Sequence, residues 1–302
     1  SDHTIAEYYE VPKEEASLEY VAIIIRHTAR APANILPHED VEWNCDDIEQ
    51  YLYVQNQFRI IPSIKNEVTN PADNPFLSRY WRGNCQSGQI TSLGLKQAIQ
   101  FGRDIWKVYG EKLEFLPNHY DNKAIYIQTS TSTRTRDVAG GLVAGLYPTS
   151  VPSDVVIYQQ PAEVDLVEPG FSCNKYQSLL AEAKTTPIWQ EHLNRLKALQ
   201  DRLEAILDTK GMPDWSSWYD HYFDVFRTRQ CHGFPLPCKI SDKKICATQS
   251  DADLVYATSN WKYNYLWRQQ PNATYMTSLR MGPWLNILKQ SFIDAIEEIA
   301  KF

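Results

Sequence analysis

Residues 18–32 read LEYVAIIIRHTARAP, an apolar, β-branched run that ends in a basic cluster and a proline. Short, continuous apolar runs of this kind are typical of buried strands in parallel sheets. The run therefore predicts a strand over 18–25, with the polar cluster 26–30 at its carboxyl end. Ligands of open α/β sheets bind at that edge, so we expect a functional site there.

The cluster 26–30 contains side chains suited to phosphoryl transfer. The His27 imidazole can attack phosphorus through a free ring nitrogen, and the Arg26 and Arg30 guanidinium groups can neutralise and orient phosphoryl oxygens. The spacing alone leaves open a second interpretation, a surface loop in which these three side chains are only solvated.

Strands and helices alternate after this cluster. Apolar runs at 124–128 and 155–158 predict two more strands, and helical periodicity predicts helices from the N-cap Thr91 to Trp106 and over 135–146. This alternation predicts an α/β fold with a mainly parallel sheet flanked by helices.

The second half of the chain has a different pattern. Between 161 and 278 helical periodicity without clear strands predicts an α-rich unit, in which Thr186 caps a helix and Pro187 takes its first position. An aromatic stripe at 215–226 is interpreted as core packing. Residues 282–302 predict a final amphipathic helix.

Composition excludes several classes of protein. The 302 residues carry a net charge of −7 with no run of Lys or Arg, which argues against nucleic acid as a partner. The longest aliphatic run, 21–25, is too short to span a membrane. The sequence contains neither a phosphate-binding glycine loop nor histidines at metal-ligand spacing, so it predicts no metal site and no cofactor.

The cysteines indicate an oxidising compartment. Their number is six, even and without a CxxC pair, which favours disulfides over a zinc ribbon and leaves the pairing open. Asn272 is in the only glycosylation sequon. We therefore expect a secreted or lumenal glycoprotein, with another oxidising compartment as the alternative.

Two motifs in order resemble the histidine acid phosphatases, branch 2 of the histidine phosphatase superfamily. Arg26, His27, Arg30 and Pro32 match the signature Arg-His-Gly-x-Arg-x-Pro, and 88–97, GQITSLGLKQ, is similar to Gly-x-Leu-Thr-x-x-Gly-x-x-Gln. Shorter segments at 173–176, 231–237 and 282–285 extend the resemblance over nearly the whole chain. The resemblance implies an α/β core with an α-helical cap, and a phosphate monoester as substrate.

The resemblance also implies site residues. His27 is then the nucleophile that forms a phosphohistidine, and Arg26 and Arg30 bind the phosphate. The family's third phosphate arginine is replaced here by Gln128, whose neutral amide donates weaker hydrogen bonds. Arg134 is a candidate to compensate for it, and Arg136 is a second, although each is more simply a helix-surface residue.

Two other departures from the family weaken the inferred mechanism. Thr28 replaces the signature glycine, and we expect its side chain to narrow the pocket floor. The family's His-Asp pair, which binds phosphate and protonates the leaving oxygen, is absent, and by the family order it is expected just after Phe302. We expect a missing or separate C-terminal piece, with a truncated chain or an absent acid as the alternatives.

The predicted function is acid-phosphatase-like hydrolysis of phosphate monoesters through a phosphohistidine on His27. The alternative is a catalytically degraded pseudophosphatase that binds a phosphorylated ligand or serves as a structural subunit of a larger assembly. The predicted organisation is a core strand with the active-site loop at 1–32, a cap-type insertion at 33–84, an α/β core at 85–160, an α-helical cap at 161–278 and a core helix at 279–302, without the His-Asp strand.

Overall fold

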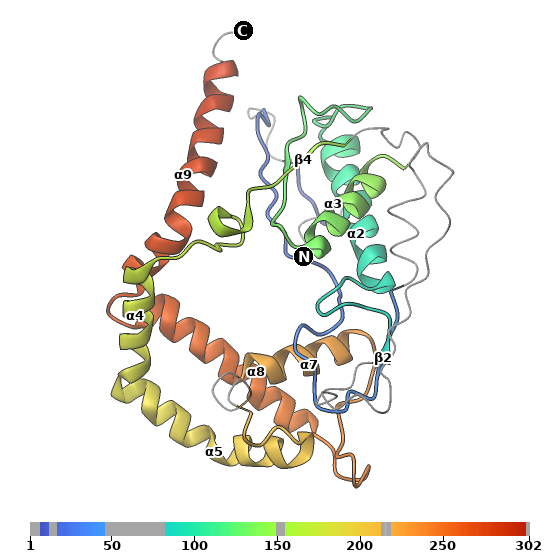
Figure 1. Cartoon of the computed structure of the whole chain (residues 1–302). Coiled ribbons are helices and arrows are strands. Elements are labelled where there is room, and N and C mark those ends of the chain that lie inside the picture. Colours follow the sequence, from blue (N-terminus) through green and yellow to red (C-terminus); the bar gives the residue numbers. More distant parts are fainter. Residues whose placement is uncertain are drawn as a thin grey trace.

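The computed structural model describes residues 7–11, 17–45, 82–148, 155–212, 215 and 219–299 (Figure 1). Residues 46–81, most of the predicted insertion, lie outside this set. The strands are β1 (Glu42–Trp43), β2 (Arg82–Gly83), β3 (Ile127–Gln128) and β4 (Ile157–Tyr158). The helices are α2 (Ser92–Ile105), α3 (Thr133–Leu146), α4 (Asn174–Thr185), α5 (Pro187–Leu207), α7 (Asp220–Cys231), α8 (Gln249–Asn264) and α9 (Ala273–Ile299), with shorter turns η2 (Trp106–Lys112), η3 (Ala162–Val164) and η4 (Tyr265–Gln269).

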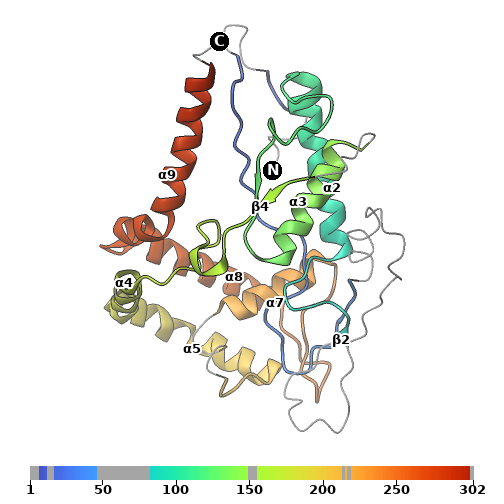
Figure 2. The same ribbon diagram turned by 45° about the horizontal axis from the view of Figure 1, so that its top comes forward.

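Helices α2 and α3 form a tightly packed pair, as Figures 1 and 2 show. Glycines make the close approach possible: a Cβ on Gly102 would lie 2.1 Å from the Leu142 carbonyl oxygen, and one on Gly145 would lie 2.0 Å from that of Ile99. The predicted cap is confirmed, because the Thr91 side chain accepts from the Gly94 N–H at the start of α2. The pair forms one helical layer of the α/β core.

The two sheets are short and parallel. β1 pairs with β2, and β3 pairs with β4 in the register Ile127↔Ile157 and Gln128↔Tyr158. The strands predicted at 124–128 and 155–158 are therefore present in shortened form. In both Figures 1 and 2 β4 and the segment 17–30 lie between α9 on one side and the α2–α3 pair on the other.

The strand predicted over 18–25 is wrong in this structure. Within the described residues, this segment makes no backbone-to-backbone hydrogen bond and belongs to no sheet. Its apolar side chains are exposed as well, at 44% for Ile23, 68% for Ile24 and 40% for Ile25. A strand needs a partner on at least one edge, and no described strand pairs with this run.

The predicted α-rich unit consists of α4, α5, α7, α8 and the first turns of α9. Thr186 caps α5 by accepting from the Trp189 N–H, with Pro187 in its first turn, as predicted. The aromatic stripe packs into a core between α5, α7 and α8, which confirms its structural interpretation for the described residues Trp215, Tyr219, Tyr222 and Phe226. This unit meets the segment 31–40 through side chains of α7.

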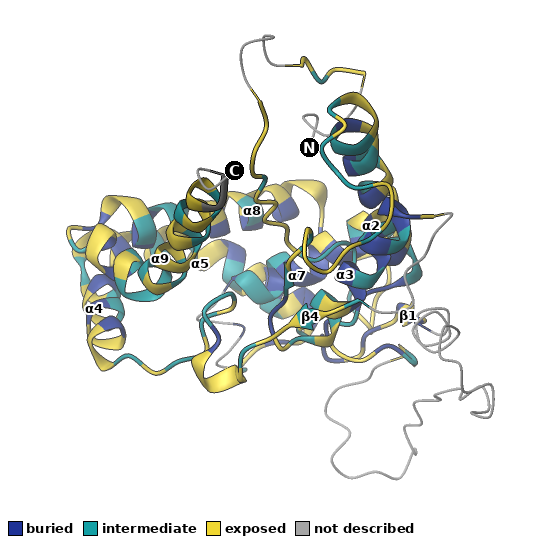
Figure 3. Cartoon of the chain, turned by 90° about the horizontal axis from the view of Figure 1, so that it is seen from above, coloured by how far each residue is buried: buried dark blue, intermediate teal, exposed yellow. Residues whose placement is uncertain are grey.

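The last helix begins earlier than predicted. α9 starts at Ala273 and has Pro283 in its interior, whereas the sequence predicts a helix that begins at 282. None of the residues 277–297 is buried, and in Figure 3 the turns of α9 near the C-terminus have the colours of exposed and intermediate residues. Its apolar side chains Leu285, Phe292 and Ile296 are exposed, and Phe292 contacts Tyr20 with ring centroids 4.7 Å apart. No helix of the described residues is long and apolar enough to cross a bilayer.

The cysteines form two of the three disulfides that their number allows. Cys45 pairs with Cys85 and Cys238 with Cys246, whereas Cys173 and Cys231 are free thiols. The first disulfide joins the chain directly after β1 to the chain directly after β2, so it ties a residue inside the predicted insertion 33–84 to the residue that follows this insertion. This pairing is a result of the structure, because the sequence left it open.

Candidate active site

The cluster 26–30 is fastened to the first turn of α2. The Thr28 hydroxyl donates to the Gly94 carbonyl at 2.6 Å, and the Ala29 N–H donates to Oε1 of Gln97 at 3.0 Å. The contact requires a glycine, because a Cβ on Gly94 would lie 1.9 Å from the Ala29 carbonyl oxygen. The side chain of Thr28, which the sequence predicts to narrow the pocket floor, is thus hydrogen-bonded to α2.

His27 has a defined tautomer. Its Nδ1 lies 3.1 Å from the Thr28 carbonyl oxygen, to which only an N–H can donate, so Nδ1 carries the proton. Nε2 is then the unprotonated nitrogen, and it accepts a hydrogen bond from Nε of Arg30 at 3.2 Å. Burial lowers the pKa of His27 to about 4, aided by the charges of Arg30, Arg26 and Arg134 and opposed by the hydrogen bond to Thr28. The imidazole is therefore neutral and nucleophilic at physiological pH.

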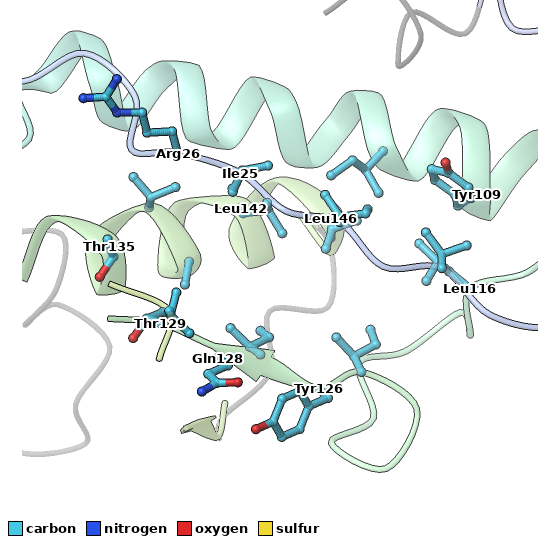
Figure 4. A pocket seen from close by; sticks show the side chains of 18 of the residues that line it. Ile25, Arg26, Tyr109, Leu116, Tyr126, Gln128, Thr129, Thr135, Leu142 and Leu146 are labelled. Atoms are coloured by element: carbon cyan, nitrogen blue, oxygen red, sulfur yellow. The ribbon is translucent and has the colours of Figure 1, made fainter. Parts of the chain in front are cut away.

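Each of the three guanidinium nitrogens of Arg30 has a partner. Besides donating to His27, it donates through Nη1 to the Ala31 carbonyl at 2.9 Å and pairs through Nη2 with Asp224 at 2.6 Å. Arg26 lies on the exposed side of the cluster, and Figure 4 shows its guanidinium directed away from Gln128. The structure thus brings His27 and Arg30 into contact and leaves Arg26 free to turn toward a ligand.

Gln128 is the last residue of β3, and Arg134 lies at the start of α3. Gln128 lines the same groove as Arg26 and His27, on the opposite wall (Figure 4). Arg134 is in the first turn of α3, close enough to His27 to lower its pKa, and its Nη2 lies 3.4 Å from Oε1 of Glu168. Arg134 is partly buried at the surface of α3.

An apolar groove extends from the cluster between two extended segments (Figure 4). One wall is 21–27, the other is 124–130, and the floor comes from α2, η2 and α3. Its volume is about 280 Å³. Among the residues that the structure describes, no group of three or more His, Cys, Asp or Glu is placed to hold a metal ion.

Two acidic residues at the site were missed by sequence reasoning. Glu168 accepts from the Ser132 hydroxyl at 3.0 Å and faces Arg134, and Asp224 pairs with Arg30. Asp224 lies within the aromatic stripe at 215–226, to which we assigned no chemistry. No local signal marks either residue, because each reaches the site from a distant part of the chain.

His232, which we expected to be structural, has contacts of that kind. Its Nε2 lies 2.7 Å from the hydroxyl of Thr91, the cap of α2, and its Nδ1 lies 2.7 Å from the Thr228 carbonyl oxygen. The ring packs edge-on against Trp43 with centroids 5.1 Å apart. His232 thus connects α7 to the start of α2.

Comparison with known proteins agrees with this geometry. Counting factor 60 of Dictyostelium discoideum is 29% identical over 263 residues, which are 82% of this chain and 60% of that protein. Human lysophosphatidic acid phosphatase type 6 is 25% identical over 233 residues, which are 74% of this chain and 52% of that protein. The chain thus spans between half and two thirds of the length of these relatives.

A solved structure shows the same fold. Hafnia alvei phytase in complex with tartrate matches 88% of this chain and 64% of its own, with a TM-score of 0.52 at 16% identity. The predicted α/β core with a helical domain is thereby confirmed. A sequence profile of the histidine phosphatase superfamily (branch 2) matches residues 17–257. Because this match covers most of the chain, the protein belongs to branch 2 of the histidine phosphatase superfamily.

Proposed function

We propose that this protein hydrolyses phosphate monoesters through a phosphohistidine on Nε2 of His27. The protonation state of His27 carries the proposal. The imidazole is neutral because its pKa is about 4, and its unprotonated nitrogen Nε2 lies beside the fixed Arg30 side chain. Similarity to a human phosphatase of phosphate monoesters supports the same activity. Among the residues that the structure describes, no contact favours the pseudophosphatase alternative over it.

The reaction proceeds in two displacements at phosphorus. In the first, the Nε2 lone pair attacks phosphorus, the bond to the ester oxygen breaks, and that oxygen takes a proton from a general acid. In the second, water attacks the phosphohistidine and gives a proton to the deprotonated general acid, the nitrogen–phosphorus bond breaks, and phosphate leaves. Arg26 and Arg30 hold the non-bridging oxygens throughout, and phosphorus takes the place of the Arg30 Nε–H at Nε2 when substrate binds.

Gln128 and Arg134 complete the proposed phosphate site. Gln128 donates an amide N–H where the family has an arginine, and Arg134 supplies the charge that the amide lacks. The effect of Arg134 on the pKa of His27 supports this role, since it places the charge within electrostatic range of the nucleophile. The neutral amide makes the site weaker than one with three arginines around the phosphate.

The proton donor is proposed to come from polypeptide outside residues 1–302, in a second chain that carries a His-Asp segment or in a larger assembly. Although partial burial acts to raise it, hydrogen bonds from Ser130 and Ser132 and the charge of Arg134 hold the pKa of Glu168 below its usual value, so Glu168 is a poor acid. The apolar groove and the exposed run 23–25 are suited to an added parallel strand.

Analysis of the active, natively purified protein tests this source of the acid. We expect mass spectrometry to find polypeptide beyond residues 1–302, and Ile24→Cys carrying a photocrosslinker to capture it. Full activity from a preparation that contains residues 1–302 alone would contradict the proposal. The exposed Ile188→Cys, on α5, is the matched control for non-specific crosslinking.

A secretory or lysosome-like lumen is the proposed compartment. The two disulfides support this compartment, because disulfides form in an oxidising environment. Asn272, directly before α9, is the proposed N-glycosylation site.

Hydrolysis of an aryl phosphate by the purified protein tests the activity. We expect His27→Ala to lower kcat by at least about a thousandfold, because the covalent route is lost. The exposed His119→Ala is the matched control and should keep the wild-type rate. Brief reaction with labelled substrate should trap an acid-labile, base-stable phosphoprotein in the wild type alone. Activity retained by His27→Ala would remove His27 as the nucleophile, and a wild type that is folded, natively purified and inactive would favour the pseudophosphatase.

A further inference from the structure

Asp224, on α7 of the α-rich unit, reaches directly into the cluster 26–30. Its Oδ1 pairs with Nη2 of Arg30 at 2.6 Å, and its Oδ2 accepts from the backbone N–H of Ala33 at 2.6 Å and of Asn34 at 3.1 Å. The side chains of Asp224 and Arg30 are only 9% and 12% exposed. This carboxylate is therefore satisfied on both oxygens and shielded from solvent.

The contacts form a continuous chain from α7 to the nucleophile. The Asp224 carboxylate holds Nη2 of Arg30, and Nε of the same guanidinium donates to Nε2 of His27 at 3.2 Å. A guanidinium is rigid and planar, so fixing Nη2 also fixes the direction of Nε. Of the five N–H groups of Arg30, three are engaged by Asp224, Ala31 and His27, which leaves two for a phosphoryl group.

We infer that Asp224 is a positioning residue for phosphate binding and transfer, which acts by holding the Arg30 guanidinium beside Nε2 of His27. Without this carboxylate the Arg30 side chain regains its rotamer freedom, and each hydrogen bond to the phosphoryl group then has to order it. The inference rests on the proposed function, since it gives Arg30 its role through the phosphate. It also makes the α-rich unit part of the catalytic machinery, because α7 contributes the anchor.

Asp224→Asn tests the inference, because it keeps the shape of the side chain and removes its charge. We expect the dissociation constant of inorganic phosphate, measured by calorimetry, to rise about tenfold, and kcat with an aryl phosphate to fall by a similar factor with a smaller change in KM. Asp220→Asn is the matched control, because Asp220 lies one turn earlier on α7 and accepts from Ser259 and Tyr263 instead. It should leave both quantities unchanged.

A double-mutant cycle separates positioning from a structural role. In an Arg30→Gln background, Asp224→Asn should change phosphate affinity by less than about twofold, since its target is gone. A full tenfold loss in that background would overturn the inference, because Asp224 would then act without Arg30. If Asp224→Asn does not fold, Asp224→Glu, which keeps the charge, is measured in the same cycle.

The outcomes also separate this inference from the proposed function. Phosphate affinity is measured without turnover, so it reports on Asp224 even if hydrolysis fails. Activity retained in His27→Ala overturns the proposed function, whereas unchanged phosphate affinity in Asp224→Asn overturns the positioning role.

Discussion

The two ring nitrogens of His27 have different partners, and this difference determines the chemistry of the residue. The Thr28 carbonyl accepts from Nδ1 and belongs to the same loop, so the tautomer is set by local backbone geometry. Burial of the ring, and to a smaller extent the arginines around it, disfavour a protonated imidazole. A histidine in this environment retains its lone pair under mildly acidic conditions.

The pH dependence of activity should report this environment. With a pKa of about 4, against an ordinary value of 6.5, His27 stays deprotonated down to about pH 4. We therefore expect the acid limb of the kcat/KM profile near pH 4. A limb near pH 6.5 would show that the nucleophile is solvated and unperturbed.

The free energy of unfolding should also fall as the pH is lowered. Below pH 6.5 the unfolded chain binds a proton at His27 that the folded protein does not, so the contribution of this residue is lost as the pH falls from 6.5 toward 4. Urea unfolding at pH 7.5 and 4.5 measures the difference, and His27→Gln should reduce it.

At the scale of elements, the α2–α3 pair positions the site. The first turn of α2 holds the cluster 26–30 through Gly94, and α3 begins next to Arg134. The two helices approach closely only where glycine replaces a side chain. The distance between α2 and α3 therefore depends on the absence of a side chain at Gly102 and Gly145.

Gly102→Ala should disrupt this contact. The added Cβ would lie 2.1 Å from the Leu142 carbonyl oxygen, so the backbones must separate, at a cost of about 2 kcal/mol in the free energy of unfolding. Gly140→Ala, on α3, is the control, because its Cβ meets nothing within 4 Å. The control should be stabilising by up to about 1 kcal/mol, since alanine favours helix. Equal effects in a urea titration would show that the contact is loose.

At the scale of the whole molecule, α7 holds the α-rich unit against the segment 31–40. Besides Asp224, α7 contributes Arg229, which is 2% exposed and pairs with Glu39 and, at 2.6 Å, with Asp40. Glu39 is fully buried, and burial raises the pKa of its carboxyl. The α-rich unit and the segment 31–40 are therefore joined by ion pairs of Arg229, and separating these charges lowers the free energy of unfolding.

Arg229→Met should destabilise the protein by about 3 kcal/mol, because it leaves the Glu39 carboxylate buried without its partner. Arg229→Met combined with Glu39→Gln should recover part of this loss. The exposed pair of Arg195 and Glu191 gives the control, since Arg195→Met should change stability by less than about 0.5 kcal/mol. Equal losses in chemical unfolding of the two arginine variants would contradict the role of burial.

The exposed run 23–25 shows where tertiary structure overrides a pattern. Its composition predicts a buried strand, but burial requires neighbours on both faces and both edges, and the described residues provide them only in part. The domain boundaries at 33–84 and 161–278 stay predictions for the same reason, because boundaries depend on contacts between distant segments.

Local features were predictable from sequence: the caps Thr91 and Thr186, the aromatic core of the α-rich unit, and the motif of His27 with its flanking arginines. They depend on residues within one or two turns of each other, so the sequence carries them in full. The disulfide pairing, the pairing of Asp224 with a loop 191 residues away and the state of the run 23–25 were decided by the tertiary structure. These depend on which distant surfaces meet, and no local pattern records that choice.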